Sequence, residues 1–479
     1  MDTQTLNTTD LIIIGAGPGG YRAAELAAKA GLKVVVFEVS NVGGTCLNEG
    51  CIPTKCYARN AELMLALRDA DTFGLEDLGY SFNYQQVVAR KDAVLAQLRT
   101  GIETLLSNPN ITLVHGEARF IDAHTVEAIP TTEDSDPSPL YNAPHIIVAT
   151  GSVPKSLRLN VLEATPLDSR DLLQMDHLPE SLCIIGAGVI GMEFASIFSA
   201  FGTKVTVVEF LKECLPALDS DIAKRLRKVM EKRGVEFFLQ CGVTGIKKNG
   251  EKGKVVCFAD KKGRELTVEA EEVLMAVGRA PRIFDHFQNA GFDYDARTGI
   301  KVDDHFETTV PGIYAIGDCN GRQKLAQAAE AQAKAVIEHI LQATNAPANS
   351  SLFTLHSSLI TSPSSLPIVP AAIFSNPEAA CVGKSEDQLK AEGVAYECRK
   401  AFHRANGKAL AMNETEGMVK LLSEPDSGRI VGCHAFGAHS ADIVQEVSAL
   451  MCRDTTVAQL RQMVHIHPTL SEILLSAAE

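Results

Sequence analysis

The sequence predicts an α/β fold that contains two Rossmann-like dinucleotide-binding domains. A glycine motif occurs twice, each time between an apolar strand-like run and a helix-like run. After each motif, the next apolar run ends in an acidic residue. The chain has 479 residues, of which 46% are hydrophobic and 22% charged, which is ordinary for a globular protein. This length suffices for about two to four domains.

The first glycine motif lies in residues 11–38, LIIIGAGPGGYRAAELAAKAGLKVVVFE. Gly15, Gly17 and Gly20 fit the pattern G-x-G-x-x-G. The first glycine permits a tight turn, the second lets the backbone approach a pyrophosphate, and the third lets the helix pack on the strand. Glu38 follows about 20 residues later, where a carboxylate accepts hydrogen bonds from ribose hydroxyls.

The same motif recurs in residues 181–209, SLCIIGAGVIGMEFASIFSAFGTKVTVVE. Gly186, Gly188 and Gly191 repeat the spacing of the first motif. Glu209 occupies the place that corresponds to the first acid. Two matches with the same internal spacing predict that the chain binds two dinucleotides.

The acid of the second motif also indicates which nucleotide binds there. A carboxylate at Glu209 would bond free ribose hydroxyls and repel a 2′-phosphate. The nearby Lys212 could soften this preference. We favour NAD over NADP because the carboxylate itself stands at the end of the strand.

Two further apolar runs each end in a small residue and a glycine. They are residues 145–152, HIIVATGS, and residues 272–282, EVLMAVGRAPR. Such strand ends suit a chain that passes close to a bound cofactor. Thr150, Gly151 and Gly278 are therefore candidate cofactor-binding residues.

A third strand-like run, residues 312–321, GIYAIGDCNG, delivers Asp318 at its end and is followed by a helix-like stretch. A carboxylate at this place could hold a sugar-like hydroxyl, and the start of the helix would offer N–H groups to a cofactor. The alternative is that Asp318 only caps the helix.

The compact cysteine pair in residues 43–55, GGTCLNEGCIPTK, permits four interpretations. A zinc site would need two more ligands at a similar spacing, and none is found. A static disulfide would close too small a loop to add much stability, and two buried thiols suit this polar, glycine-rich stretch poorly. We favour a redox disulfide beside the first dinucleotide. A helix that starts near Cys51 would favour a nucleophilic thiolate there.

The charge and hydropathy of the chain exclude several classes of partner. The formal net charge is −14 and the basic residues are not segregated, so no nucleic-acid partner is predicted. No run of about 18 apolar residues is present, and residues 1–17 lack the basic cluster of a targeting peptide. We expect a soluble, cytoplasmic protein without a membrane segment or a metal site.

Taken together, several stretches resemble the flavoprotein disulfide reductase family. They are GAGPGG with Glu38, GGTCLNEGCIPTK, ATG, GAGVIGME, AVGRAPR, AIGD and HIHPTLSE. The resemblance runs from about residue 10 to the C-terminus. A C-x4-C pair within the sequence context GGTCLNEGCIPTK is very specific for this family.

The resemblance implies that the first motif binds FAD, the second binds NAD, and a disulfide Cys46–Cys51 lies against the flavin. Cys51 would be nearer the flavin, and Cys46 would exchange with a dithiol substrate. Lys55 and Glu193 match a buried ion pair near the flavin, where a cation stabilises negative charge. The alternative of a surface lysine and a solvated glutamate fits the apolar context IGMEFAS poorly.

The resemblance also implies that His467 is the base and that Glu472 orients its imidazole. His465 is a nearby alternative, but the family pattern places the working histidine directly before a proline, which selects His467. In this family the histidine reaches the disulfide of the partner chain. A homodimer is therefore expected to be part of the mechanism.

The implied reaction is the oxidation of protein-bound dihydrolipoamide, with electrons passing through the cysteine pair and FAD to NAD⁺. The implied partners are the lipoyl domains of an acyltransferase (E2) or the H-type carrier protein of the glycine cleavage system. Two alternatives remain: another FAD-dependent disulfide reductase of the same family, and a non-catalytic flavin-binding subunit. The retained cysteines, histidine and glutamate argue against the second.

The domain order implied by the resemblance adds an α+β C-terminal dimerisation domain. The predicted boundaries are 1–153 for the first part of the FAD domain, 154–282 for the NAD domain, 283–353 for the segment that completes the FAD domain, and 354–479 for the interface domain. The stretches 129–142 and 354–369 are predicted to be loops, and the sequence assigns them no function.

Overall fold

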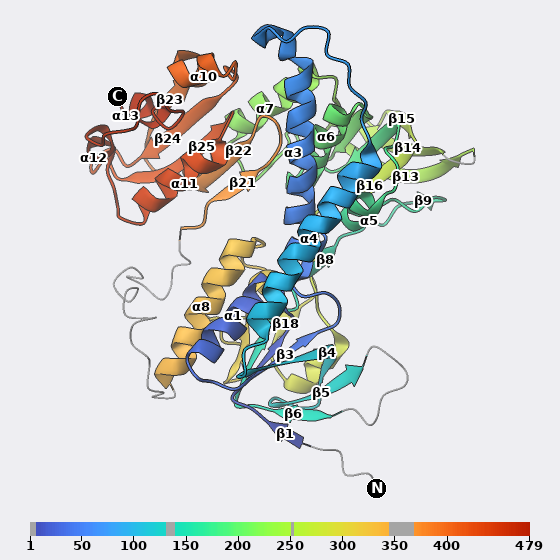
Figure 1. Cartoon of the computed structure of the whole chain (residues 1–479), viewed down its shortest axis with the longest axis vertical. Helices are drawn as coiled ribbons and strands as arrows, with labels where there is room; N and C mark the ends of the chain where they lie inside the picture. Colours follow the sequence, from blue (N-terminus) through green and yellow to red (C-terminus); the bar gives the residue numbers. More distant parts are fainter. Residues whose placement is uncertain (1–5, 131–138, 251–252, 344–367) are drawn as a thin grey trace. The chain divides into compact units, whose positions relative to one another are not determined.

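The computed structural model describes residues 6–130, 139–250, 253–343 and 368–479, and it confirms the α/β class (Figure 1). The chain divides into two compact units, each assembled from three stretches of sequence. The first unit comprises 1–53, 91–154 and 279–367, and the second comprises 54–90, 155–278 and 368–479. The predicted domain boundary at 353/354 lies outside the described residues, as do parts of both predicted loops. The loop prediction for 129–142 is wrong at its described ends, where residues 129–130 belong to strand β5 and 140–142 form strand β6.

The first unit is built on an eight-stranded sheet in the order β1-β6-β5-β4-β3-β2-β7-β20. Its strands are β1 (Leu6–Thr8), β2 (Leu11–Ile14), β3 (Val34–Glu38), β4 (Ile111–Phe120), β5 (Thr125–Pro130), β6 (Leu140–Asn142), β7 (His145–Val148) and β20 (Ile313–Ala315). The strands from β4 through β20 in this order run parallel, whereas β4, β5 and β6 pair antiparallel. The parallel part is the predicted Rossmann-like sheet.

Both faces of this parallel sheet are covered, as its continuous apolar strands require. Leu11 and Ile13 of β2 belong to the core shared with α1 (Pro18–Lys29) and α8 (Ala326–Ala343), two helices that pack against each other (Figure 1). Ile12 and Ile14 point to the other face and join Phe120 and other apolar residues of the second core. The alternation of side chains along β2 thus produces two cores from one strand.

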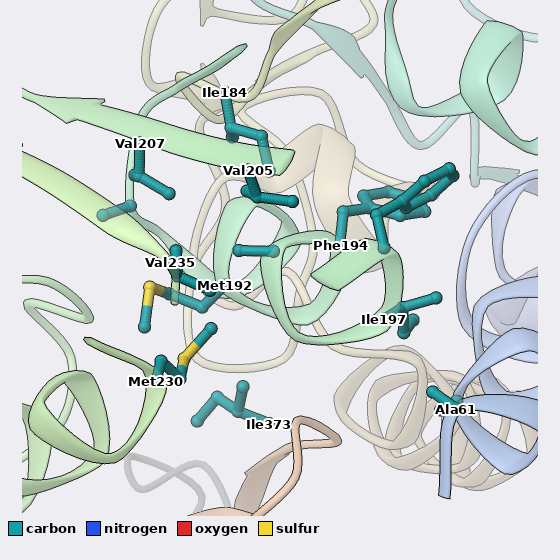
Figure 2. Close-up of a cluster of buried hydrophobic side chains, with 14 of the residues drawn as sticks. Ala61, Ile184, Met192, Phe194, Ile197, Val205, Val207, Met230, Val235 and Ile373 are labelled. Carbon is teal, nitrogen blue, oxygen red and sulfur yellow. The ribbon is translucent and has the colours of Figure 1, made fainter. Parts of the chain in front are cut away.

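The second unit contains a four-stranded parallel sheet in the order β12-β11-β10-β16. Its elements are β10 (Ser181–Ile185), α6 (Val189–Phe201), β11 (Lys204–Glu209), α7 (Ser220–Lys232), β12 (Glu236–Leu239) and β16 (Glu272–Met275). One face packs on α6 and α7 and forms the largest core of the unit, part of which Figure 2 shows. This is the second predicted Rossmann-like sheet.

The opposite face of that sheet packs on a second sheet in the order β15-β14-β13-β9. Its strands are β9 (Val161–Leu162), β13 (Cys241–Asn249), β14 (Gly253–Asp260) and β15 (Glu265–Ala270). Shorter elements are α2 (Gly44–Asn48), α5 (Ser169–Gln174), β8 (Ser152–Pro154) paired with β17 (Arg279–Pro281), and β18 (Tyr294–Asp295) paired with β19 (Gly299–Ile300). Two long helices, α3 (Cys51–Arg68) and α4 (Tyr84–Leu106), each contribute residues to both units.

The C-terminal part of the second unit is α+β, as predicted. It has a five-stranded antiparallel sheet in the order β21-β22-β25-β24-β23. Its elements are β21 (Ala371–Ile373), β22 (Ala379–Gly383), α9 (Glu386–Glu392), β23 (Glu397–Phe402), α10 (Gly407–Ala411), β24 (Met418–Ser423), β25 (Ile430–Phe436), α11 (Ser440–Met451), α12 (Val457–Arg461) and α13 (Ile473–Ala478). Helices α11, α12 and α13 share its core.

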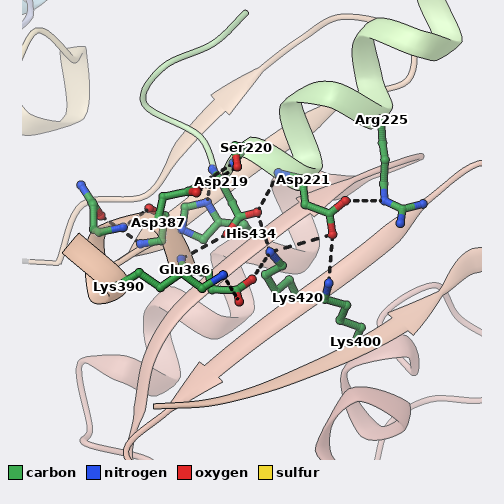
Figure 3. Close-up of polar contacts among 12 residues, drawn as sticks. Asp219, Ser220, Asp221, Arg225, Glu386, Asp387, Lys390, Lys400, Lys420 and His434 are labelled. Atoms are coloured by element: carbon green, nitrogen blue, oxygen red, sulfur yellow. Dashed lines mark hydrogen bonds and ion pairs between the residues drawn. The ribbon is translucent and has the colours of Figure 1, made fainter. Parts of the chain in front are cut away.

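A buried polar network connects the start of α7 to this C-terminal sheet (Figure 3). Lys420 of β24 is only 1% exposed, and its Nζ lies 2.6 Å from Asp219 Oδ1 and 2.7 Å from Glu386 Oε2. His434 of β25 accepts a hydrogen bond from the backbone N–H of Asp219 at its Nδ1, and burial lowers the pKa of this histidine. Because a buried ammonium is costly without partners, the network fixes the position of α7 on the sheet.

Membrane-spanning helices and metal-binding clusters are both absent from the described residues. Among the described helices, none combines the length and the apolar character that crossing a membrane demands. Within the described part of the chain, no group of three or more His, Cys, Asp or Glu side chains is placed to hold a metal ion.

Candidate active site

The first glycine turn joins β2 to α1 and leaves no room for a side chain at two of its glycines. Gly15 has φ +106°, and a Cβ there would lie 2.4 Å from the carbonyl oxygen of Ala149. A Cβ on Gly20 would lie 1.8 Å from the carbonyl oxygen of Gly15. A Cβ on Gly17 would meet its nearest atom, Gly44 Cα, at an ordinary 3.9 Å. The fold itself does not require glycine at this middle position, which fits close approach by a pyrophosphate.

The second glycine turn, between β10 and α6, has the same pattern. Gly186 has φ +103°, and a Cβ there would lie 2.6 Å from the carbonyl oxygen of Ala276. A Cβ on Gly191 would lie 2.0 Å from the carbonyl oxygen of Gly186. A Cβ on Gly188 would meet no atom within 4 Å among the described residues. The second turn therefore also has room for a phosphate group at its middle glycine.

Glu38 at the end of β3 is buried and holds the first glycine turn. Its Oε2 accepts a hydrogen bond from the backbone N–H of Ala16 at 2.8 Å, and its Oε1 accepts from the N–H of Ser40 at 3.0 Å. Ala16 stands between the first two glycines of the motif. The acid thus links the strand end to the turn, a role that the sequence analysis did not assign to it.

Glu209 at the end of β11 does the same for the second turn. Its Oε2 accepts from the backbone N–H of Ala187, and its Oε1 accepts from the N–H of Leu211 at 2.7 Å. The two acids are equally buried, at 8% exposure each. Both predicted ribose contacts therefore start from a carboxylate whose position the backbone has already fixed.

The segment that precedes the cysteine pair packs directly on the first glycine turn. The N–H of Gly43 donates to the carbonyl oxygen of Ala16 at 2.8 Å. A Cβ on Gly44 would lie 2.7 Å from Gly17 Cα, so only glycine permits this approach. Both glycines also have positive φ angles, of 98° and 58°. The chain that leads into the cysteines is thereby placed against the candidate pyrophosphate site.

The two cysteines stand at the ends of a tight connection. Cys46 lies in α2 and is half-buried, and Cys51 is exposed at the first residue of α3. Between them the chain folds back: Thr45 O accepts from Glu49 N at 2.9 Å, and a Cβ on Gly50 would lie 3.1 Å from the same oxygen. The residues that precede the two cysteines are thus in contact. The predicted helix start near Cys51 is confirmed.

Lys55 and Glu193 form the predicted ion pair inside the second unit. The Nζ of Lys55 lies 3.0 Å and 3.1 Å from the two carboxylate oxygens of Glu193, which is buried. The same carboxylate accepts from the backbone N–H of Phe374, and the ammonium stands 4.6 Å from the centre of the Phe374 ring. The alternative of a solvated helical glutamate is therefore wrong.

The strand-end segments hold the remaining candidates in the first unit. Thr150 donates from its hydroxyl to the carbonyl oxygen of Arg282 at 3.0 Å, and Gly151 accepts from the N–H of the same arginine. Gly151 has φ +72° and Gly278, in the second unit, has φ +102°. Both glycines are needed for the sharp change of direction after the strands β7 and β16.

Asp318 lies in a short 3-10 helix, Gly317–Asn320, directly after β20. Its Oδ2 accepts from the hydroxyl of the buried Ser152 at 2.5 Å, and Arg279 donates from Nε to the same hydroxyl at 2.8 Å. The helix-capping alternative is wrong because α8 begins only at Ala326. Ser152 and Arg279 were missed, although both stand in the two strand-end segments that the sequence singled out.

His467 and Glu472 are brought together in the loop between α12 and α13. The Nδ1 of His467 lies 2.9 Å from Glu472 Oε1, and Thr469 donates its backbone N–H to Glu472 Oε2 at 2.7 Å. The N–H of Thr469 and then His467 lower the pKa of the Glu472 carboxyl, so it stays ionised. The imidazole is held at Nδ1 and leaves Nε2 toward solvent, since its side chain is 81% exposed. His465 bonds a different carboxylate, Glu446, which the sequence analysis missed.

The candidates divide between the two units. The first unit contains Gly15, Gly17, Gly20, Glu38, Cys46, Cys51, Thr150, Gly151 and Asp318. The second contains Lys55, Gly186, Gly188, Gly191, Glu193, Glu209, Gly278, His467 and Glu472. Within the units, the structure joins the cysteine segment to the first turn, Lys55 to Glu193, and His467 to Glu472.

The chain is similar to known proteins along almost its whole length. The chain is 35% identical to the dihydrolipoyl dehydrogenase of Bacillus subtilis, over 98% of this chain and 97% of that protein. It is 34% identical to the dihydrolipoyl dehydrogenase of Geobacillus stearothermophilus, over 98% and 96%. Among solved structures it is similar to the HOCl-induced flavoprotein disulfide reductase RclA from Escherichia coli, with a TM-score of 0.81 and 27% identity over 98% of this chain and 99% of that one.

Residues 369–478 match the dimerisation domain of the pyridine nucleotide-disulphide oxidoreductases, and residues 9–333 match the description Pyridine nucleotide-disulphide oxidoreductase. Proteins of this kind use FAD and NAD(H), and the two glycine turns, each with room for a Cβ at its middle glycine, fit two such dinucleotides. The chain belongs to the pyridine nucleotide-disulphide oxidoreductase family.

Proposed function

We propose that this protein is a dihydrolipoamide dehydrogenase, which oxidises dihydrolipoamide and reduces NAD⁺ to NADH. The observation that carries the proposal is the packing of Gly44 on Gly17, which places the segment leading to Cys46 against the first glycine turn. The names of the Bacillus subtilis and Geobacillus stearothermophilus relatives, which align along almost the whole chain, support this substrate over other disulfides.

The first turn is assigned to FAD and the second to NAD. Gly17 and Gly188 would face the pyrophosphates, and Glu38 and Glu209 the riboses. Thr150, Gly151, Asp318 and Gly278 would line the path of the cofactors at the strand ends. When bound, the flavin supplies a two-electron acceptor for the reduced cysteine pair and a hydride donor for NAD⁺.

The protein's own part of the reaction is thiol-disulfide exchange. A thiolate of the dithiol attacks the sulfur of Cys46, the Cys46–Cys51 bond breaks, and Cys51 leaves as a thiolate. The second thiol of the substrate then attacks its own sulfur bound to Cys46, which releases the oxidised substrate and leaves both cysteines reduced. The position of Cys51 at the first residue of α3 stabilises the leaving thiolate.

His467 is the base that accepts the substrate's thiol proton, at Nε2. Glu472 holds Nδ1 of the ring, which fixes the tautomer in which Nε2 is the acceptor. The Lys55–Glu193 pair would place a positive charge close to the reduced site, because Lys55 follows Cys51 by one helical turn in α3.

A homodimer is part of the proposal. The match of residues 369–478 to the family's dimerisation domain supports it, and so does the surface around the base. Val464 and Ile466, which lie on the same loop shortly before His467, are 98% and 80% exposed in the single chain. Exposed apolar residues beside a catalytic group are expected at a surface that a second copy covers.

The physiological substrate is proposed to be a lipoyl group on an acyltransferase (E2) domain or on the H-type carrier protein of the glycine cleavage system. The names of the two bacterial relatives, both dihydrolipoyl dehydrogenases, support a lipoyl substrate.

The test of the proposal is an anaerobic titration of the purified protein with dihydrolipoamide, followed by NAD⁺. We expect a flavin spectrum, a long-wavelength band from a thiolate beside the flavin, and then NADH. Cys51→Ser should lose the band, and His467→Gln should slow turnover roughly 100- to 10,000-fold. The control is His177→Gln, since His177 is also an exposed histidine that pairs with a carboxylate. Turnover with another disulfide and NADPH, but not with dihydrolipoamide, would refute the proposed substrate.

A second experiment tests whether the base acts on the partner chain. Hybrid dimers are made from one Cys51→Ser chain and one His467→Gln chain, each carrying a different affinity tag. If the base acts across the dimer, each hybrid has one intact site and is active, although both parent dimers are inactive. Inactive hybrids would place the base and the disulfide of a working site in the same chain.

A further inference from the structure

Within residues 463–468 of the loop that presents His467, only His465 is not exposed, and its side chain is 7% accessible. Its neighbours Val464 and Ile466 point outward at 98% and 80% exposure. His465 is therefore the one side chain that attaches this stretch to the interior, in addition to the bonds from Met463 N–H to Leu460 O and from the Thr469 hydroxyl to Ile466 O.

The ring of His465 is hydrogen-bonded to a carboxylate on helix α11. The Nε2 of His465 lies 2.8 Å from Oε1 of Glu446, which stands on α11 beside the buried face formed by Val447 and Val444. Helix α11 packs on the C-terminal sheet and is itself fixed by that core. The pair His465–Glu446 thus connects helix α11 to the stretch 463–468, whose other residues are exposed.

The hydrogen bond to Glu446 also indicates which nitrogen of the His465 ring carries the hydrogen. The Nδ1 of His465 is buried and has no hydrogen-bond partner among the described residues. A neutral imidazole that donates from Nε2 to Glu446 leaves an unprotonated Nδ1, which costs less to bury than an unsatisfied N–H. The ring acts here as a fixed donor and stands apart from the proton transfer assigned to His467.

His465 and His467 stand two residues apart on the same loop. Each imidazole is hydrogen-bonded to a carboxylate, His465 to Glu446 on α11 and His467 to Glu472 at the start of α13. The side chain of His465 is buried, whereas that of His467 is exposed.

We propose that His465 and Glu446 are positioning residues for His467: the buried pair sets the loop so that Nε2 of His467 is presented to the substrate thiol. This rests on the proposed function, because it takes His467 as the base. Glu472 orients the ring of His467, whereas the His465–Glu446 pair fixes the backbone that carries the ring. A loop freed from its anchor would misplace the base by an ångström or more, which costs roughly 100-fold in rate.

The experiment compares two reactions of the same holoenzyme. Oxidation of dihydrolipoamide by NAD⁺ needs the base, whereas reduction of ferricyanide by NADH needs the cofactors but no thiol deprotonation. We expect His465→Ala and Glu446→Ala to lower kcat for dihydrolipoamide roughly 10- to 100-fold and leave ferricyanide reduction unchanged. His465→Gln, whose amide can still donate to Glu446, should recover much of the loss. Gln445→Ala, on the same helix and exposed, is the matched control and should behave as wild type.

A double variant separates positioning from a general structural role. His465→Ala combined with His467→Gln should be no slower than His467→Gln alone, because the anchor has no effect once the base is absent. Equal losses in both reactions, or losses that multiply in the double variant, would overturn the inference. If His467→Gln is slow but His465→Ala is not, the inference fails and the proposed function stands. If His467→Gln itself turns over dihydrolipoamide normally, the proposed function fails as well.

Discussion

The two glycine turns have nearly the same backbone but different surroundings. In each, the first glycine has a φ angle close to +105° and the third meets the carbonyl oxygen of the first. Each turn also accepts one bond from a later segment, at Ala16 O from the N–H of Gly43 and at Ala187 O from the N–H of Leu215. The difference lies at the middle glycine: Gly44 packs on Gly17, whereas a Cβ on Gly188 would meet nothing within 4 Å among the described residues. The motif therefore specifies the turn, and the neighbouring chain determines how enclosed the site is.

This difference matches the roles proposed for the two sites. A cofactor that stays bound through many turnovers is best held in a turn that protein closes over. A nucleotide that must enter and leave in each cycle needs an open one. The two acids, in contrast, act alike, each on its own turn. Glu38 and Glu209 each accept one bond from the N–H between the first two glycines and one from the N–H two residues after the acid.

The largest effect is expected at the third glycine of each turn, where the two regions should behave alike. Gly20→Ala and Gly191→Ala place a Cβ at 1.8 Å and 2.0 Å from a backbone oxygen. Each should lower the free energy of unfolding by about 3 kcal/mol or more, measured by urea denaturation. Gly101→Ala, where a Cβ meets nothing within 4 Å in the middle of α4, is the control and should not destabilise. Wild-type stability in both variants would show that the turns can relax.

Substitution of the middle glycines should weaken ligand binding while leaving the stability of the fold unchanged. Gly188→Ala makes no contact with described protein atoms, so its free energy of unfolding should change by less than about 0.5 kcal/mol. NADH binding, measured by calorimetric titration, should weaken roughly 10- to 200-fold, because the methyl group occupies space needed by the pyrophosphate. Gly17→Ala should instead reduce the flavin content of the purified protein. Unchanged NADH affinity in the first variant would remove the second turn as a nucleotide site.

Replacing the two acids by amides should show a smaller shared effect and one difference. In Glu38→Gln and Glu209→Gln one backbone N–H loses its charged acceptor, and we expect each to cost about 1 to 3 kcal/mol in unfolding free energy. Only Glu209→Gln should also narrow the preference for NADH over NADPH, since the repulsion of the 2′-phosphate is removed. The ratio of kcat/KM for the two nucleotides measures this. An unchanged ratio would mean that another group, such as Lys212, sets the preference.

The smallest effect concerns the acid stability of the second unit, which carries the open turn. The ammonium groups of Lys390 and Lys420 lower the pKa of Glu386 to about 2. An unfolded glutamate has a pKa of about 4.3. The ion pairs of Glu386 with Lys390 and Lys420 therefore stabilise the fold above that pH, and this stabilisation is lost as the pH falls toward 2. Thermal unfolding followed between pH 5 and pH 3 should show this loss. The fall should be smaller in Glu386→Gln, and an equal fall would contradict the assignment.

The parts of the site that follow from local spacing were predictable. The glycines, the two acids and the start of α3 at Cys51 depend on contacts within a few residues or within one βαβ unit, and the sequence pattern reports such contacts directly. The pairs Lys55–Glu193 and His467–Glu472 were expected from the resemblance to a family. In the structure both are hydrogen-bonded, at 3.0 Å and 2.9 Å.

Other residues could not be found because their partners are distant in sequence. Ser152 and Arg279 meet Asp318 across three separate strand ends, and nothing in their local pattern indicates a shared hydrogen bond. From the sequence, His465 was an alternative to His467 as the catalytic base. Only the position of Glu446 on α11 distinguishes a buried donor from an exposed base.

Two βαβ glycine turns, each ending in an acid, and a cysteine pair after the first turn follow from the amino-acid sequence alone. These features follow from steric limits on glycine and from the alternation of apolar residues, which act over short stretches of chain. Three features depend on the tertiary structure: the packing of Gly44 on the first turn, the burial of His465 rather than His467, and the carboxylate to which each histidine is hydrogen-bonded. Those outcomes depend on packing between elements far apart in sequence, where burial and hydrogen bonding are set by neighbours that no local pattern records.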